Sequence, residues 1–207
     1  MPVEKANIGL YDVKDLMVVK SGDGYAMQLV CPRATAFVLC FSKGTEPVDC
    51  ESLNLTDTEL EDLHNNAMFE RNGCRLQGVM AHTFMSMPQF KGFKVNPPEL
   101  VQVWSMSRNN FGTIKLYKPL EEAAVFVPLN YSVQFGMAGN CVTLQVGLDP
   151  KKLDNYTDGS ILYRVSGMDP VPIPRSWLNR PFRLNAPNKD AVKIVVSEQF
   201  QNMYRQD

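Results

Sequence analysis

Residues 131–148 read YSVQFGMAGNCVTLQVGL and contain two short runs of β-forming residues around a break. The runs YSVQF and CVTLQVGL are rich in Val, Tyr, Phe, Leu and Thr, which suit the pleated surface of a sheet. The break between them, FGMAGN, contains glycines and an asparagine, which favour turns. This stretch therefore predicts two strands separated by a turn.

The same pattern recurs in both directions from this stretch. Further runs include DLMVVK at 15–20, TAFVLCF at 35–41, ELVQVWSM at 99–106 and AVKIVVS at 191–197. About ten such runs without alternating long helices predict an antiparallel sandwich or barrel, and not a parallel α/β sheet. A chain of 207 residues has the size of one domain, so we expect residues 1–207 to form a single β-sandwich domain.

One helix is expected within this β-rich chain, over residues 56–71. Thr56 is a suitable N-cap, and Glu59 stands three places on, which together make the reciprocal capping box. Asn72 and Gly73 supply the stop signal. A lone helix between strands is similar, in architecture only, to the connections of viral jelly rolls. The predicted fold is therefore mainly β, a jelly-roll-like antiparallel sandwich with one inserted helix.

The charge of the chain is nearly balanced, with a formal net charge of −1 at pH 7. A stand-alone nucleic-acid binder usually has a strong basic excess, so any contact with a polyanion must be local. The first twenty residues mix charges into apolar residues, and no run of about 18 apolar residues occurs, so we expect neither a signal peptide nor a membrane partner. The five cysteines follow no disulfide or zinc spacing, which favours reduced thiols and a cytoplasmic location.

Motifs that carry catalysis are missing from the sequence. It contains no phosphate-binding glycine loop, no H-E-x-x-H and no G-x-S-x-G. His64, Cys74 and His82 are the candidates for a Cys–His couple or a metal site, but their spacing matches no compact zinc pattern. We therefore expect no enzyme activity, no cofactor and no bound metal.

Acidic and basic residues are segregated along the chain. Residues 46–62 contain seven acids and no Lys or Arg, whereas residues 85–118 are basic and rich in aromatics. Aromatics beside basic residues can bind single-stranded nucleic acid, but in a β-rich chain they also alternate between core and solvent. If the protein self-associates, the two stretches are predicted to meet between copies, which would make association salt-sensitive. The candidates for polyanion contact are Lys91, Lys94, Arg108, Lys115 and Lys118.

Residues 169–187, DPVPIPRSWLNRPFRLNAP, combine prolines with arginines and aromatics. Proline has no backbone donor and a fixed φ, so PVPIP is neither helix nor central strand. We expect an extended, largely unpaired arm within residues 166–190 that packs either on its own sandwich or on a neighbouring copy. Tryptophan and arginine are frequent interface anchors. The interface candidates are Arg175, Trp177, Arg180, Phe182 and Arg183.

These features favour a non-enzymatic structural or assembly protein that forms homo-oligomers, such as a virion coat or shell component. The alternative is a cytosolic β-sandwich module that binds a protein, a peptide or single-stranded nucleic acid. The third hypothesis is an enzyme of a type that has no short sequence motif. Self-association distinguishes the first hypothesis from the other two.

Overall fold

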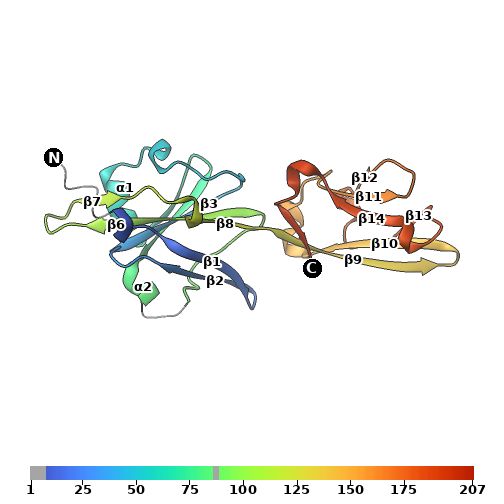
Figure 1. The fold of residues 1–207 in the computed structure, drawn as a ribbon, viewed down its shortest axis with the longest axis horizontal. Coiled ribbons are helices and arrows are strands. Elements are labelled where there is room, and N and C mark those ends of the chain that lie inside the picture. The colour runs from blue at the N-terminus through green and yellow to red at the C-terminus, as the bar shows by residue number, and fades with distance from the viewer. Residues whose placement is uncertain (1–7, 86–88) are drawn as a thin grey trace. The chain divides into compact units, whose positions relative to one another are not determined.

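The computed structural model describes residues 8–85 and 89–207, and this part of the chain is mainly β, with several antiparallel sheets (Figure 1). Its contacts group the chain into two compact units. Unit 1 comprises Met1–Val95 and Glu99–Val127, and unit 2 comprises Asn96–Pro98 and Pro128–Asp207. The single domain that the sequence predicts stays a prediction.

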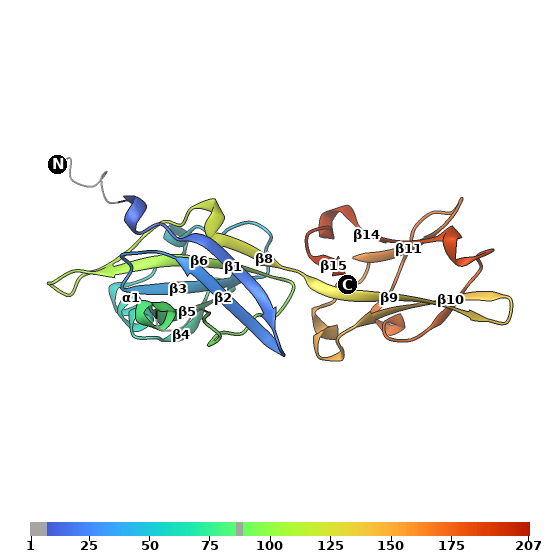
Figure 2. The same cartoon turned by 60° about the horizontal axis from the view of Figure 1, so that its bottom comes forward.

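The main sheet of unit 1 is antiparallel and has the order β4-β5-β3-β6-β7, with β8 also paired to β6. A separate hairpin of β1 and β2 lies outside this sheet, as the blue ribbons of Figure 2 show. The strands of the unit are β1 (Lys14–Ser21), β2 (Gly24–Val30), β3 (Ala36–Ser42), β4 (Met68–Arg71), β5 (Cys74–Met80), β6 (Glu99–Arg108), β7 (Ile114–Leu116) and β8 (Ala124–Val127). Its α-helices are α1 (Asp57–His64) and α2 (Ala81–Met85).

Strand β3 is buried along its whole length because both faces of the main sheet are covered. Phe37, Leu39 and Phe41 point into one core cluster, which also contains Met27 of β2. The alternate residues Ala36, Val38 and Cys40 point into a second cluster, with Leu63 of α1. This alternation follows from the two-residue period of a strand. It explains why the run AFVLCFS is almost continuously apolar.

The predicted capping box is confirmed, but the predicted helix over 56–71 is too long. Thr56 accepts a hydrogen bond from the Glu59 amide, and Glu59 accepts one from the Thr56 amide at 2.9 Å. The α-helix ends at His64, and residues 68–71 form β4. Asn72 and Gly73, with φ of 51° and 76°, turn the chain from β4 into β5. Asn-Gly favours a two-residue hairpin turn, so the expected helix stop is a strand-to-strand turn.

Unit 2 has two sheets around one shared core. A four-stranded sheet has the order β13-β10-β9-β15, and a three-stranded sheet has the order β12-β11-β14. Leu129, Val142, Ile161 and Val192 come from different strands of the two sheets and belong to the same core cluster. The strands are β9 (Leu129–Ala138), β10 (Cys141–Leu148), β11 (Ile161–Val165), β12 (Val171–Pro172), β13 (Phe182–Leu184), β14 (Val192–Val196) and β15 (Tyr204–Gln206).

Two short parts of the proline-rich segment pair as strands, and the largely unpaired arm that the sequence predicts stays a prediction. Val171–Pro172 forms the edge strand β12, which pairs with β11, and Phe182–Leu184 forms β13, which pairs with β10. Between them Ile173 is fully buried in the unit 2 core and donates its amide to Ile161 at 2.9 Å. Proline tolerates an edge position, where one side of the strand needs no donors. The segment therefore packs on its own unit.

Within the described residues, no helix has the length and apolar character that a membrane crossing requires.

Candidate functional site

An exposed aromatic pair lies within the proline-rich segment. The rings of Trp177 and Phe182 have their centroids 4.8 Å apart and are tilted by 44°. Phe182 is partly buried against the unit 2 core and also contacts Tyr163, with ring centroids 5.7 Å apart. Trp177 remains 40% exposed. A tryptophan held in one orientation by a core-anchored ring can present a large apolar area to a partner.

The contacts of Arg175 hold the turn that carries Trp177. The Arg175 amide donates to Asp158 Oδ1 at 2.7 Å, and its guanidinium donates to the Tyr156 carbonyl at 2.8 Å. The guanidinium also lies 3.4 Å from the Asp154 carboxylate. Arg175 begins the short 3₁₀ turn Arg175–Trp177, in which Trp177 donates its amide to Pro174 at 2.9 Å. Arg175 is thus engaged within its own unit, and its role is to position Trp177.

The other two predicted interface arginines do not gather around Trp177 in the same way. Arg183 lies opposite Thr143 in the β10–β13 pairing, whereas Phe182 lies opposite Leu144. Neighbouring residues of a strand point to opposite faces, so Arg183 faces away from the side that carries Phe182. Arg180 is exposed in the turn before β13. Of the five candidates, the structure brings Trp177 and Phe182 together.

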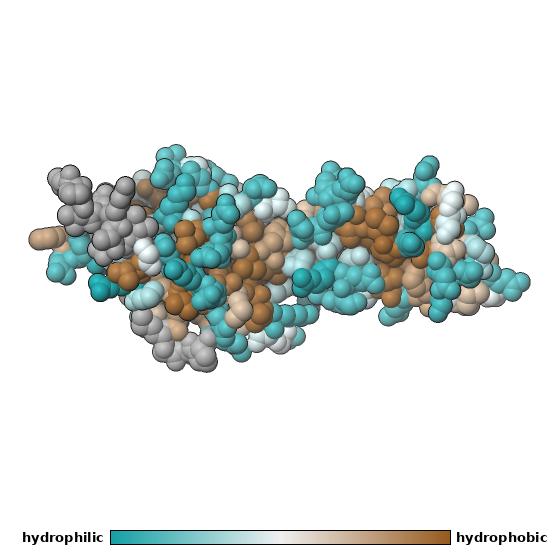
Figure 3. Space-filling view, viewed as in Figure 1, coloured by the Kyte–Doolittle hydropathy of each residue, from teal (hydrophilic) through white to brown (hydrophobic). Residues whose placement is uncertain are grey.

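Two residues that the sequence analysis did not select extend this apolar surface. Phe135 on β9 lies opposite Leu144 on β10, which in turn lies opposite Phe182 on β13. These three side chains therefore share one face of the sheet. Phe135 is 40% exposed and Met137, two residues on, is 65% exposed. Figure 3 shows hydrophobic surface between hydrophilic patches in the half of the molecule formed by β9 to β15.

Phe135 ends the predicted strand YSVQF, and Met137 lies within FGMAGN, which the sequence predicts to be a turn. The turn itself is only Gly139 and Asn140, because Ala138 pairs with Cys141. Gly139 has a φ of 63°, as the first position of a tight hairpin turn allows for glycine. The alternation of Val133, Phe135 and Met137 is the signal that could have revealed them.

The five candidates for polyanion contact lie at different places on unit 1. Lys91 and Lys94 belong to the segment before β6, whereas Arg108 ends β6 and Lys115 lies on β7. Arg108 is opposite Ile114 and Lys115 is opposite Ser107, so Arg108 and Lys115 point to opposite faces of the sheet. Lys118 follows β7. The structure does not bring the five onto one surface.

Part of the charge pairing expected between copies occurs within the chain. The Arg108 guanidinium lies 3.1 Å from the Glu61 carboxylate, and Arg71 forms an ion pair with Glu59. Both acids belong to the acidic stretch 46–62. These pairs partly neutralise the stretch and reduce its attraction for another copy.

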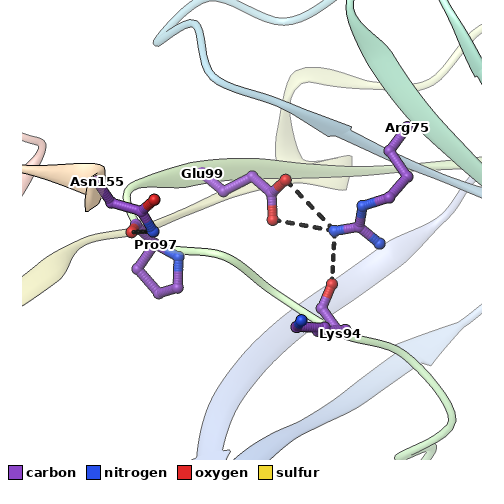
Figure 4. Close-up of polar contacts among 5 residues, drawn as sticks. All are labelled: Arg75, Lys94, Pro97, Glu99 and Asn155. Atoms are coloured by element: carbon purple, nitrogen blue, oxygen red, sulfur yellow. Dashed lines mark hydrogen bonds and ion pairs between the residues drawn. The ribbon is translucent and has the colours of Figure 1, made fainter. Parts of the chain in front are cut away.

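A buried ion pair in unit 1 is the strongest rival site (Figure 4). The Arg75 guanidinium lies 3.2 Å from Glu99 and donates to the Lys94 carbonyl at 2.6 Å. The Glu99 side chain is only 8% exposed. One carboxylate held by a guanidinium is not the pair of unlike carboxylates that acid–base catalysis uses. The Arg75–Glu99 pair, together with the hydrogen bond to Lys94, attaches the segment before β6 to the sheet. Within unit 2, Asn155 donates to the Pro97 carbonyl at 2.8 Å.

The histidines and cysteines considered for chemistry are not brought together. Cys74 is buried at the start of β5, and His82 is exposed in α2, which begins after that strand ends. The strand separates them by about 20 Å at the usual rise per residue. His64 Nε2 lies 3.0 Å from the Thr35 hydroxyl, and burial lowers the pKa of His64 below its ordinary value. Residues 8–85 and 89–207 contain no group of three or more potential metal ligands.

No protein-family model matches the chain, and no curated protein matches it. The candidate site is therefore the exposed apolar surface of unit 2, and the chemistry of its own residues is the basis for this choice.

Proposed function

We propose that the protein is a non-enzymatic structural protein that assembles with copies of itself through unit 2. In this proposal it is a component of a virion coat or another protein shell, present in the cytoplasm or in the particle. The two sheets of unit 2 around one core suit the jelly-roll-like sandwich that such components use. This comparison concerns architecture alone, so the argument rests on the surface.

The observation that carries the proposal is the exposed Trp177 ring packed at a tilt against Phe182. Interfaces concentrate their binding energy in a few large aromatic or arginine side chains. Trp177 is held by Phe182 on one side and by the turn that Arg175 anchors on the other. A side chain already fixed in place loses little freedom when a partner covers it. Burying it would then contribute the apolar area that is still exposed in a single copy.

The alternative is a binding module for a different protein, a peptide or single-stranded nucleic acid. The basic candidates on unit 1 support nucleic acid only weakly, because Arg108 is paired with Glu61 and faces away from Lys115. A module of this kind would be monomeric without its ligand. The oligomeric state therefore distinguishes the two functions.

The test compares Trp177→Ala with Phe111→Ala, an aromatic that is 94% exposed in unit 1. Light scattering after size exclusion should show oligomers for the natural chain and for Phe111→Ala. Trp177→Ala should shift toward monomer while its melting temperature changes little, because the ring is substantially exposed. Natural chain that stays monomeric at high concentration would contradict the proposal, and so would equal assembly of the two variants.

A further inference from the structure

One edge of unit 2 is formed by β12, β13 and the segment that connects them. Strand β12 is an outer strand of the three-stranded sheet, and β13 is an outer strand of the four-stranded sheet. The last two strands of the chain, β14 and β15, form the opposite edges of the same two sheets. Residues 169–182 thus make a surface, here named the β12–β13 surface, at the edges away from those last strands. Trp177 belongs to it.

The backbone around β12 excludes strand pairing at this edge. The Ile173 amide donates to the Ile161 carbonyl, so residues 171 and 173 direct their hydrogen-bonding groups toward β11. The alternate positions face away from β11, and they are Pro170, Pro172 and Pro174. Proline has no N–H, so a further strand would find no backbone donor here. A partner of this surface must therefore bind through side chains.

The exposed side chains of the β12–β13 surface include both halves of a known type of contact. Trp177 is 40% exposed, and Pro172 is exposed on β12. Aromatic side chains bind the prolines of extended segments, which is how aromatic-lined grooves recognise proline-rich chains. Each copy of the protein thus carries an aromatic ring and a proline that a second copy can use.

Opposite charges flank this ring and this proline. Asp169 precedes Pro172 by the same number of residues as Arg180 follows Trp177, and both charged side chains are exposed. Within residues 8–85 and 89–207, neither has an ion-pair partner. If two copies of the segment meet antiparallel with Trp177 on Pro172, the equal spacing also brings Arg180 to Asp169. Apolar and charged residues therefore agree on one register.

We propose that the β12–β13 surface packs against the same surface of a second copy about a twofold axis, with Trp177 of each copy on Pro172 of the other and Arg180 of each copy beside Asp169 of the other. The inference rests on the proposed function and names the surface that receives Trp177. A twofold contact uses one patch on both copies, so each interaction occurs twice. Ion pairs at the exposed rim add little affinity and mainly fix the register.

A second copy fits this surface better than an unrelated protein. The ring, the proline and the two opposite charges that the contact uses all lie in one short segment, so the surface is complementary to itself. A twofold contact also closes on itself and makes dimers, which a different contact can join into larger assemblies. An unrelated partner would instead leave the natural chain monomeric.

The first experiment compares Arg180→Glu with Arg183→Glu. Arg183 is also exposed, but it faces away from the side of the sheet that carries Phe182. Sedimentation velocity of the 207-residue chain should show that Arg180→Glu raises the dimer dissociation constant about tenfold or more, since it places a carboxylate against Asp169 twice in each dimer. Arg183→Glu should associate like the natural chain. Equal association of the two variants would overturn the inference.

The second experiment reverses the charges together. The double variant Asp169→Lys, Arg180→Glu has opposite charges again, in exchanged positions, so its dissociation constant should return to within about threefold of that of the natural chain. Rescue of this kind is not expected if Arg180→Glu merely disturbs the fold. A double variant that associates as weakly as Arg180→Glu would overturn the pairing of Arg180 with Asp169.

The third experiment tests the position of the axis by cross-linking. The register places the axis between residues 174 and 175, close to the exposed Ser176 and farther from the exposed Ser166. In a Cys141→Ser background, which removes the exposed natural thiol, a short bis-maleimide should link Ser176→Cys into covalent dimers more efficiently than Ser166→Cys. Reversed yields would overturn the proposed axis.

The failure of this inference can be told from the failure of the proposed function. If Trp177→Ala disrupts assembly while Arg180→Glu and Arg183→Glu associate alike, the twofold contact is wrong and the proposed function stands. A natural chain that never associates would overturn both.

Discussion

The guanidinium of Arg75 lies 3.9 Å above the centre of the Phe41 ring while it holds the Glu99 carboxylate at 3.2 Å. Phe41 and Arg75 are directly opposite each other on β3 and β5, and Glu99 begins β6. The three strands are thus joined on one face by a cation over a ring and by an ion pair. The arrangement stabilises unit 1 and the segment before β6.

Arg75→Met should lower the free energy of unfolding by about 3 kcal/mol, because it removes the cation from a carboxylate that is largely shielded from water. The matched control is Asp154→Asn, which removes an ion pair whose side chains are 45% and 101% exposed. Exposed pairs contribute about 0–1 kcal/mol. Urea unfolding of both variants checks the prediction. Equal losses would show that burial of the Arg75–Glu99 pair has no energetic consequence.

Thr56→Ala should destabilise unit 1 by about 1 kcal/mol, because it removes the side-chain acceptor that caps α1. Thr58→Ala is the control, since Thr58 is exposed two residues into the same helix. Thermal unfolding followed by circular dichroism should give a lower midpoint for the first variant than for the second. A lower midpoint for Thr58→Ala would contradict the capping argument.

His64 should make the fold less stable as the pH falls from 7.5 to 5. Burial, and then the charge of Arg108, lower the pKa of His64 below 6.5 in the folded state. The unfolded chain therefore binds the proton more readily, and the stability present above about pH 6.5 is lost at lower pH. His64→Gln should show a smaller loss in urea unfolding over this pH range than the natural chain. Identical pH dependence in the two proteins would refute this.

Features encoded locally could be predicted from the sequence. The strands of residues 131–148 and the capping box of Thr56 and Glu59 depend on neighbouring residues, and both are confirmed. The end of the helix was wrong because Asn72 and Gly73 suit two structures that both need positive φ. The choice between a helix stop and a hairpin turn is made by the pairing of residues 68–71 with β5.

The candidate surface depended on contacts that no local pattern contains. Trp177 and Phe182 could be selected by residue type, but the role of Arg175 in holding the turn follows from its contacts with Asp158 and Tyr156. Phe182 shares one sheet face with Phe135 through the pairing of β10 with β9 and with β13. The pairing of β10 with β13 joins segments distant in the sequence, so no local pattern reveals it.

Sedimentation velocity of the natural chain over a range of concentrations, at low and high salt, tests the central claim most directly. The account predicts that the mass rises above the 23.3 kDa of one copy as concentration increases. The residue that carries the proposed contact, Trp177, is uncharged, so association should change little with salt; a strong salt dependence would favour contact between the acidic and basic stretches. A single species of 23.3 kDa at every concentration would contradict the claim that this protein assembles with itself.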